Sequence, residues 1–348
     1  MYGELYTKYK SEVIGVVYSR TELESSSLVK SKANDVIIPC SGETAIDIST
    51  ARCVPFNNIL LGGDLNIIRL KHDDGGFFAY QLNGARKKDI ARVAQGVSVV
   101  HLYGENLKHI RVNHPVIEEQ KKITRLLSLI DERIATQNKI IEKLESLIKG
   151  LSQRLLSPKQ GWTSYKLDEL CQIKSGYSGI QVSFQTAYKV SRIETISNHC
   201  INMSRIGFVK EIPQEYKLRV GDILFSNINS VQYIGNTAFI DKDYGLYHGM
   251  NLLRIVPDSR IVFPRFIHLL LCSERLLRHF QSICNKAVSQ ASINQTSLGK
   301  TMMTIPSYKE QQHICSIIES VERKLDIETS LLKMLQYQKQ YLLRQMFI

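Results

Sequence analysis

The sequence predicts an α+β fold: two related, strand-rich domains joined by two long antiparallel coiled-coil helices, with pseudo-two-fold symmetry between the halves. Three observations lead to this prediction. The second half of the chain repeats the first, the front of each half holds short β-branched and aromatic runs, and the rear of each half follows a long heptad pattern. Short apolar runs broken by Gly and Asn are typical of strands, whereas sustained heptads are typical of coiled coils.

The internal repeat defines the organisation of the chain. Seven residues recur without a gap at an offset of 191; upstream of them the offset is 185 at Asn66 and Arg69, and 187 further upstream, at Asp35, Thr50 and Ala51. Small insertions in surface loops explain such a drift. Because copies of this length exceed any solenoid period, the repeat indicates a duplicated domain and not an array. The matched residues are Val97, Ser98, Leu107, Pro115, Glu119, Gln120 and Ile123 with Val288, Ser289, Leu298, Pro306, Glu310, Gln311 and Ile314; Asp35, Thr50 and Ala51 with Asp222, Thr237 and Ala238; and Asn66 and Arg69 with Asn251 and Arg254.

Each copy has a strand-rich front and a helical rear. In the second copy, the runs DILFS and NTAFI predict strands, and Pro264 can begin a helix that continues to about residue 284. The first copy has a shorter helical counterpart at residues 77–93. In chain order, the expected segments are the first strand-rich domain (1–115), the first long helix (116–157), the second strand-rich domain (158–305) and the second long helix (306–348).

The two rear segments carry the clearest periodicity in the sequence. Their apolar residues follow a strict 4-3-4-3 spacing, which is the seam of a coiled coil. Each helix would be roughly 60 Å long at 1.5 Å per residue. Pairing the two helices within the chain is the simplest way to bury both seams. The seam positions are Ile123, Leu127, Ile130, Ile134, Gln137, Ile141, Leu144, Ile148, Leu151 and Leu155, and Ile314, Ile318, Val321, Leu325, Glu328, Leu332, Leu335, Lys339, Leu342 and Met346.

Two polar seam residues are expected to meet. Gln137 lies near the middle of the first helix, and its repeat equivalent Glu328 lies near the middle of the second. An antiparallel pair would bring them together at the crossing. We hypothesise that this polar layer fixes the register of the helix pair. The alternative is that both residues are solvated flank positions that only coincide with the heptad frame.

The composition limits the class of protein. With 348 residues, 43% of them hydrophobic and 22% charged, the chain can bury two ordinary cores. Its apolar runs fall short of the roughly 18 residues of a membrane span. The start of the chain carries no secretory core, and the seven cysteines are scattered without a CxxC spacing, so a cytoplasmic location is expected. The net charge of +12 favours nucleic acid as partner; the alternative is a protein that is basic for solubility alone.

No catalytic motif is visible in the sequence. The chain has no GxGxxG, HExxH or GxSxG, no Asn/Asp-Pro-Pro-aromatic motif of an N-methyltransferase, and no histidine pair at i,i+4. The LGKT run at residues 298–301 lacks the first glycine of a phosphate-binding loop, because that position is Asn294. We therefore expect neither catalytic residues nor metal ligands.

Polar and aromatic loops remain as candidates for binding. In the second domain, the runs KSGY, SNINS, YGLYHG and NKAVSQASINQTS are rich in Asn, Gln, Ser, Tyr and Lys. Such side chains read base edges and hold phosphates. Any one of these runs alone is more simply an ordinary turn, since Asn, Gly and Ser favour turns for backbone reasons. As a set on a basic, duplicated scaffold, they favour binding to nucleic acid.

An ordered series of motifs runs through the second copy. A Trp-x-x-x-x-Leu-x-Glu-Leu opening at Trp162 is followed by a Lys-Ser-Gly turn, GDILFS, AVSQASINQTSL, a Pro-x-x-x-Glu-Gln entry at Pro306 and a heptad helix; the entry and helix occur again from Pro115. In this order of parts, the whole chain resembles the DNA specificity subunit of a type I restriction-modification system. The resemblance implies two target recognition domains, each reading one half of a split DNA site, with the helix pair acting as a ruler.

The resemblance also implies the partners. A specificity subunit of this family is not itself catalytic. The expected partners are double-stranded DNA, two methyltransferase (modification) subunits and, in the full complex, the restriction subunits. S-adenosylmethionine and ATP with Mg²⁺ are expected on those partner subunits only, and no cofactor is expected on this chain.

The residues that we expect to contact DNA lie in the polar loops of both copies. Asn, Gln, Ser, Tyr and Lys side chains can read base edges and hold phosphates, and the residues of the first domain are the equivalents of those in the second. In the second domain they are Lys174, Tyr177, Asn227, Asn229, Tyr233, His248, Ser289, Gln290 and Asn294, and in the first domain they are Ser41, Gly42, Thr44, Arg86, Lys87, Gln95 and Ser98.

The first copy departs from the family pattern at its start. It has 33 residues before Asn34, whereas the second copy has 60 from Trp162 to Gly221, and the Trp and Lys-Ser-Gly opening has no counterpart. We therefore expect a first recognition domain that is shortened at its N-terminus, because the sequence begins late or the gene is a truncated or recombined allele. The alternative function is a protein-interaction scaffold that binds modification subunits but reads DNA poorly. A diverged nuclease or methyltransferase is a second alternative.

Overall fold

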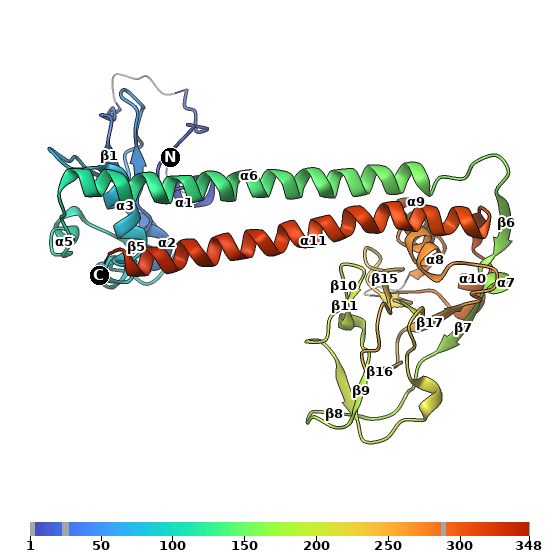
Figure 1. The fold of residues 1–348 in the computed structure, drawn as a ribbon. Coiled ribbons are helices and arrows are strands. Elements are labelled where there is room, and N and C mark those ends of the chain that lie inside the picture. The colour runs from blue at the N-terminus through green and yellow to red at the C-terminus, as the bar shows by residue number, and fades with distance from the viewer. Residues whose placement is uncertain (1–3, 23–27, 287–289, 348) are drawn as a thin grey trace. The chain divides into compact units, whose positions relative to one another are not determined.

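The structure is a computed structural model that describes residues 4–22, 28–286 and 290–347. The chain divides into two compact units, the first made of Met1–Glu142 with Asp326–Ile348 and the second of Lys143–Leu325. Each unit combines helices with small sheets (Figure 1), so the predicted mixed α and β class is confirmed. None of the described helices is long and apolar enough to cross a membrane.

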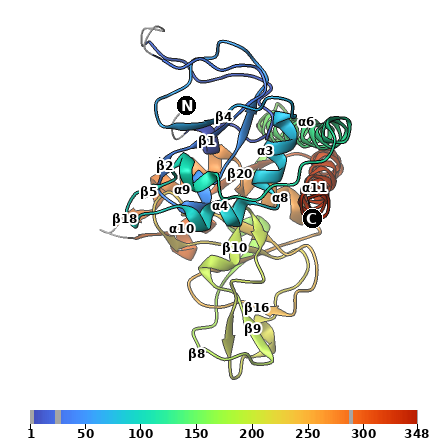
Figure 2. The same cartoon turned by 90° about the vertical axis from the view of Figure 1, so that its left-hand side faces the viewer.

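The first unit is built on a three-stranded antiparallel sheet. Its elements are α1 (Glu4–Thr7), β1 (Asp35–Pro39), β2 (Ser41–Gly42), α2 (Ala45–Ile48), β3 (Arg52–Val54), β4 (Leu65–Ile68), α3 (Gly75–Asn83), α4 (Lys87–Val93), β5 (Val100–His101), α5 (Gly104–Leu107) and parts of α6 (Ile117–Leu155) and α11 (Tyr308–Gln345). The strand order is β3-β1-β4, and β2 pairs with β5. Val36 of the central strand shares a core with Phe77 of α3 and Leu127 of α6, and Figure 2 shows α3 beside α6.

The second unit has a larger set of strands. They are β6 (Thr163–Lys166), β7 (Cys171–Ser175), β8 (Gln181–Val182), β9 (Tyr188–Val190), β10 (Ile196–Ser197), β11 (Cys200–Ile201), β12 (Gly207–Val209), β13 (Ile223–Phe225), β14 (Ile228–Asn229), β15 (Thr237–Phe239), β16 (Leu246–Tyr247), β17 (Leu253–Pro257), β18 (Asn285–Lys286), β19 (Ala291–Ser292) and β20 (Met302–Ile305). The helices are α7 (Leu167–Leu170), α8 (Pro264–Leu271), α9 (Glu274–Ile283), α10 (Gln295–Gly299) and the 3-10 turns η2 (Ile193–Thr195) and η3 (Gln214–Tyr216). The sheets have the orders β15-β13-β17-β7, β16-β9-β12-β8 and β14-β19-β18, with β20-β6 and β10-β11 as pairs.

The two units share one framework. The order β15-β13-β17 in the second unit repeats the order β3-β1-β4 in the first. Beside the central strand, Asp35 pairs with Arg69 at 2.8 Å, and the equivalent Asp222 pairs with Arg254 at 2.6 Å. The second unit adds β7 on the far side of β17. Among the described residues of the first unit, no strand borders β4 on that side.

The glutamine of each Pro-x-x-x-Glu-Gln motif ties a long helix to its domain. Gln120 accepts a hydrogen bond from the N–H of Asp74 at 2.8 Å, and Gln311 accepts one from the N–H of Phe263 at 2.8 Å. Both side-chain amides also donate to the carbonyl oxygen of the motif's own proline, at 2.8 and 3.0 Å. Asp74 and Phe263 are the N-cap residues of α3 and α8. The motif therefore fixes the start of one helix against the start of another in both copies.

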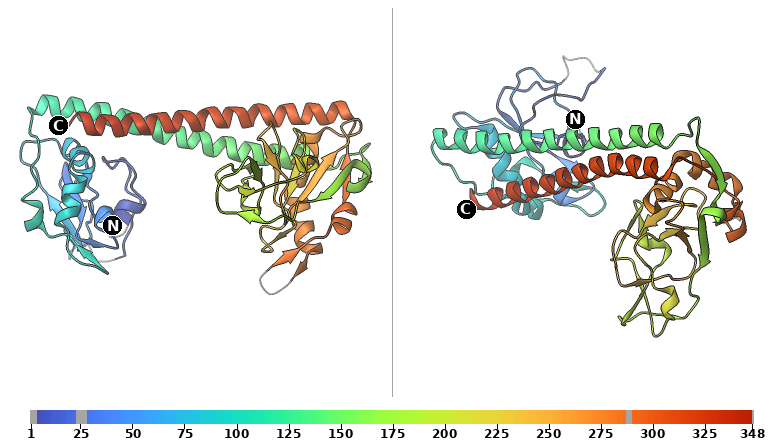
Figure 3. Two further views of the ribbon diagram at one scale, coloured as in Figure 1. Left: turned by 90° about the horizontal axis from the view of Figure 1, so that it is seen from below. Right: turned by 45° about the vertical axis from the view of Figure 1, so that its right-hand side comes forward.

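The two long helices are antiparallel, as predicted. In the first unit, Gln137 meets Glu328, and Asp131, nearer the start of α6, meets Lys339, nearer the end of α11. In the second unit, Leu155 packs on the core that contains Ile314 and Ile318. Every expected seam position is buried or half-buried. Both views of Figure 3 show α6 (green) beside α11 (red).

The single helix expected from Pro264 to residue 284 is two helices. Pro264 stands in the first turn of α8, where its missing N–H costs nothing. The helix ends at Leu271, and Ser273 begins α9 by accepting a hydrogen bond from the N–H of Leu276. Leu276 and Phe280 are both buried in the core, so the apolar period continues across the break. Periodicity alone therefore does not reveal that Ser273 caps a new helix.

Candidate nucleic-acid interface

The Lys-Ser-Gly turn of the second unit places Lys174 and Tyr177 beside His248. Lys174 lies one residue before the end of β7, opposite Arg254 of β17. The chain then crosses to a parallel bridge between Tyr177 and Gly249. Gly176 permits this approach, because a Cβ atom there would lie 1.9 Å from the carbonyl oxygen of Gly249. The N–H of Tyr177 donates to the carbonyl oxygen of His248 at 3.0 Å. Three of the residues predicted for DNA contact are thus brought together.

A polar pocket of about 240 Å³ lies at this turn. It is lined by Lys174, Ser175, Glu215, Tyr216, His248 and Arg254. His248 is 1% exposed, and its Nε2 lies 3.0 Å from the carbonyl oxygen of Leu252. Because a carbonyl only accepts, we assign the ring proton to Nε2. Burial lowers the pKa of His248 to about 4, so the ring is neutral at pH 7 and adds no charge to the pocket.

Arg254 is a buried member of this pocket's lining. It is 4% exposed, its Nη2 pairs with Asp222, and its Nη1 donates to the carbonyl oxygen of Glu215 at 3.2 Å. Its Nε is buried and has no hydrogen-bond partner in the described structure. Burial raises the pKa of Asp222, and the backbone N–H of Arg219 and the guanidinium of Arg254 oppose that shift. Arg254 is one of the residues that the internal repeat matches, but it is not among the residues predicted for DNA contact.

A second group of predicted residues surrounds the β14-β19-β18 sheet. Asn227 donates to the carbonyl oxygen of Ile293 at 3.4 Å, while its Oδ1 is buried without a partner among the described residues. Asn229 donates to Ser226 at 3.1 Å. Asn294 caps α10 by accepting the N–H of Ser297 at 2.7 Å, so its oxygen serves the fold.

The remaining predicted residues of the second unit are more open. Tyr233 is 51% exposed, and Gln290 is exposed as well. Ser289 lies outside the described residues. Gln295, which the sequence argument did not select, donates to the carbonyl oxygen of Ile173 at 2.6 Å. Because Ile173 precedes Lys174, this bond joins the α10 loop to the strand that carries the first group.

In the first unit, four of the predicted residues gather around β2 and α2. Ser41 and Gly42 form β2, which pairs with β5, and Thr44 caps α2 by accepting the N–H of Asp47 at 3.2 Å. Gln95 pairs with His101 of β5 through two backbone hydrogen bonds of 2.9 and 2.7 Å. Gln95 is exposed, whereas Ser41 and Gly42 are buried, which limits what those two can offer to a ligand.

Arg86, Lys87 and Ser98 complete the predicted set of the first unit. Arg86 is the N-cap residue of α4, and its Nε is buried without a partner in the part of the chain that the structure describes. The Nζ of Lys87 lies 3.5 Å from Thr50. Burial, followed by the neighbouring charge of Arg52, lowers the pKa of Lys87. Ser98 lies in an exposed loop.

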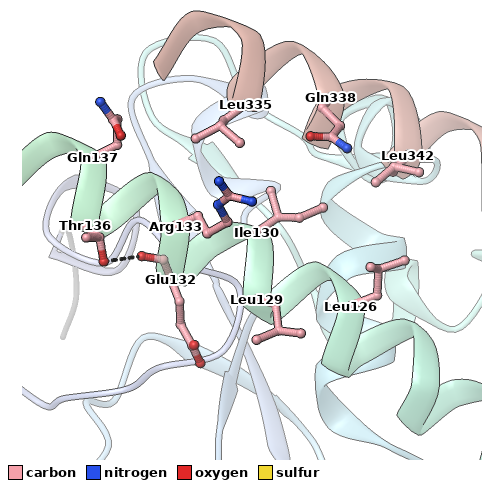
Figure 4. A pocket seen from close by; sticks show the side chains of 10 residues that line it. All are labelled: Leu126, Leu129, Ile130, Glu132, Arg133, Thr136, Gln137, Leu335, Gln338 and Leu342. Atoms are coloured by element: carbon pink, nitrogen blue, oxygen red, sulfur yellow. Dashed lines mark hydrogen bonds between the residues drawn. The ribbon is translucent and has the colours of Figure 1, made fainter. Parts of the chain in front are cut away.

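The helix pair of the first unit carries an open, largely apolar groove of about 810 Å³. Figure 4 shows Leu126, Leu129 and Ile130 of α6 on one side and Leu335 and Leu342 of α11 on the other. Leu126 is 43% exposed and Leu129 is 39% exposed. Such exposure on paired helices is typical of a surface that takes a further helix.

Gln137 lies at the end of this groove and contacts Glu328. Its Nε2 donates to the Glu328 carboxylate at 2.5 Å and to the Glu328 carbonyl oxygen at 3.0 Å. Gln137 is 6% exposed. The two residues therefore meet, while their role in fixing register stays a prediction.

A buried charge cluster elsewhere on the same helix pair was not predicted. Lys339 lies 2.6 Å from Glu12 and 2.6 Å from Asp131, and Tyr80 donates to Asp131 at 2.7 Å. Burial, followed by the charge of Glu12, raises the pKa of Asp131, and Lys339 opposes this shift. A lysine on the heptad seam was the available signal, because a charge at such a position needs a buried partner.

A family model matches two stretches of this chain, residues 3–146 and residues 159–337. It describes the type I restriction modification DNA specificity domain. The two stretches together cover most of the chain.

Curated relatives carry the same description. The chain is 32% identical over 194 residues to the type I restriction enzyme MjaX specificity subunit of Methanocaldococcus jannaschii, an alignment that covers 54% of this chain and 46% of that protein. It is 24% identical over 268 residues to the MjaVIII specificity subunit of the same organism, covering 67% and 60%. The chain thus spans less than two thirds of the length of either relative.

The fold is also found among solved structures. The S subunit of a type I restriction-modification system from M. genitalium superposes with a TM-score of 0.62 at 19% sequence identity, over 100% of this chain and 91% of that one. At this level of identity, the similarity shows a shared fold.

Proposed function

The chain belongs to the type I restriction-modification DNA specificity family, and from that premise we propose that it is a sequence-specific subunit that reads a bipartite site on double-stranded DNA. The family match over two stretches of one chain carries this proposal. A duplicated reader with pseudo-two-fold symmetry suits two half-sites on one duplex. The net charge of +12 favours binding to a polyanion such as DNA.

The DNA contacts are proposed for both units. In the second unit, the candidate surface comprises the Lys174 turn together with the exposed Tyr233 and Gln290. In the first unit, it comprises the exposed Gln95 and Ser98 beside β5. Exposed polar and aromatic side chains on loops can adapt to different target bases without changing the framework.

The chain is proposed to act without catalysis of its own and to recruit methyltransferase subunits. The groove between α6 and α11 supports this proposal, because its rim exposes Leu126 and Leu129. Met334, Tyr337 and Tyr341 of α11 are also more than 60% exposed. An amphipathic helix of a modification subunit would cover such a surface. S-adenosylmethionine, ATP and Mg²⁺ would then act on the partner subunits only.

A scaffold that binds modification subunits but reads DNA poorly is the second candidate. One observation favours it: within the described residues, the sheet of the first unit has three strands, whereas the equivalent sheet of the second unit has four. A reader without its fourth strand would present a different surface to DNA.

The proposal is tested by measuring duplex binding with the full chain co-purified with its modification subunits. We expect tight binding that weakens by about 10³–10⁵-fold between about 50 and 200 mM salt, if about six to ten phosphates are contacted. The modification subunits alone are the control. A complex that forms, but binds duplex no better than the control at low salt, would identify the scaffold and reject the DNA-reading function.

A further inference from the structure

The polar pocket of the second unit places two cations directly opposite each other. Lys174 of β7 and Arg254 of β17 are register partners in the antiparallel sheet, so their side chains lie on the same face. Like charges at directly opposite positions destabilise a sheet. The arrangement is therefore unfavourable unless negative charge is supplied.

The protein supplies only part of that charge. Asp222 lies 2.6 Å from Nη2 of Arg254 and also accepts the backbone N–H of Arg219 at 2.7 Å. In the described structure, Lys174 has no ion-pair partner and Nε of Arg254 has no acceptor. A buried donor without an acceptor is costly. Lys174 is therefore an unpaired cation at the pocket, and Arg254, which also lines it, has a guanidinium whose hydrogen bonds are incompletely satisfied.

The shape and the remaining lining residues point to an oxyanion. A pocket of about 240 Å³ holds more than one water molecule. Tyr216 packs against Tyr177, with ring centroids 5.3 Å apart, so part of the aromatic surface is already used. Glu215 is exposed and gives its backbone oxygen to Arg254. Guanidinium and ammonium groups together are the usual donors to phosphate oxygens.

We propose that this pocket binds one phosphate of the DNA backbone, with Lys174 as the donor and the guanidinium of Arg254, which lines the pocket, as the second positive charge. The inference rests on the proposed function and adds a positioning contact, which fixes the protein on the duplex without reading a base. It applies to the second unit only. In the first unit, the equivalent Arg69 uses both Nε and Nη2 on Asp35, at 2.9 and 2.8 Å, which leaves no free Nε.

The test replaces Lys174 with methionine, which removes the charge but keeps the apolar stem. The full chain, in complex with its modification subunits, is titrated with random-sequence duplexes over a range of salt concentrations. A plot of the logarithm of the association constant against the logarithm of salt concentration falls with increasing salt. Loss of one phosphate contact should make this slope less negative by about 0.9. Lys210→Met is the matched control, since Lys210 is exposed in the same unit and does not line the pocket.

Three results separate the possibilities. Failure of the unsubstituted complex to bind any duplex overturns the proposed function itself. If both variants bind DNA with the same salt slope, the phosphate site is rejected while the proposed function stands. The phosphate site is also rejected if Lys174→Met loses affinity only for particular sequences, because that would indicate a base contact. The expected result is an equal loss of affinity on all duplexes, confined to Lys174→Met.

Two further measurements exclude a structural role and a free anion. Because Lys174 faces a like charge, Lys174→Met should not lower the Tm of the DNA-free protein; a lower Tm would assign Lys174 to the fold. Inorganic phosphate is compared with chloride at matched ionic strength. A rise in Tm with phosphate that disappears in Lys174→Met, together with an unchanged salt slope on duplex DNA, would assign the pocket to a free anion and overturn the assignment to DNA.

Discussion

Lys339 occupies a seam position of α11 and bridges two buried carboxylates, so Lys339→Met tests how far the helix pair depends on a buried charge. Its side chain is 14% exposed, and those of Glu12 and Asp131 are each 9% exposed. Removing one partner of a buried ion pair costs about 3–5 kcal/mol, because the opposite charge is left uncompensated. Arg52 is buried in the same region and interacts with both carboxylates, which favours the lower end of that range.

The expected effect is large enough for thermal denaturation. A destabilisation of about 3 kcal/mol corresponds to a Tm lower by roughly 6–12 °C for a unit of this size. Lys333→Met is the matched control, because Lys333 is exposed on the same helix and should change the Tm little. Asp131→Asn in the Lys339→Met background should recover part of the loss, since it removes one of the two stranded carboxylates.

The pH dependence gives an independent check on the cause. Burial already raises the pKa of Asp131 above its ordinary 3.8, and losing Lys339 removes a charge that opposes this shift. A folded-state pKa above the unfolded value gives stability that is present at low pH and lost as pH rises. The deficit of Lys339→Met should therefore be smaller near pH 4 than at pH 8. A Tm equal to that of Lys333→Met at every pH would refute the reasoning.

Three further perturbations test other parts of the account. Gln120→Ala and Gln311→Ala should each destabilise the unit concerned by about 1–3 kcal/mol, because a buried N–H and a buried carbonyl lose their hydrogen-bond partner. Denaturant titration measures this loss. An unchanged free energy of unfolding in both variants would show that these glutamines do not support the fold. Because burial lowers the pKa of His248 to about 4, protonation favours the unfolded state, and stability should fall by about 3 kcal/mol as pH drops from about 6.5 to 4. His248→Gln should flatten this profile, measured as Tm against pH; an unchanged profile would mean that other groups cause it. Replacing both Gln137 and Glu328 with leucine should allow the helix pair to shift its register or the chain to form oligomers. Cysteine cross-linking reports the register and light scattering reports the oligomeric state; if neither changes, the two residues do not fix the register.

Much of the fold follows from patterns that report directly on burial. The 4-3-4-3 spacing predicts that Leu127, Ile130 and Ile318 are buried, as they are, because residues at these positions share the one helix face that packs against the partner helix. The matched Asp35–Arg69 and Asp222–Arg254 pairs explain why those residue types recur in both copies. The break between α8 and α9 was not predicted, because a capping serine leaves the apolar period intact.

The candidate site could be predicted only in part, because composition does not distinguish a side chain that holds the fold from one that is free to bind. Asn294 and Thr44 were selected as polar loop residues, and the structure shows both capping helices. Lys174 was selected from the Lys-Ser-Gly turn, but its neighbour Arg254 became part of the pocket only through strand register. Register between strands about 80 residues apart in the chain leaves no local signal in the sequence.

The most direct test of the central claim is to select a randomised duplex library with the full chain in complex with its modification subunits and to sequence the bound DNA. If two related units each read one half of a split site, the selected duplexes will share two short blocks separated by a spacer of fixed length and unspecified sequence. A single contiguous block, or no enrichment while the complex still binds duplex, would contradict the account.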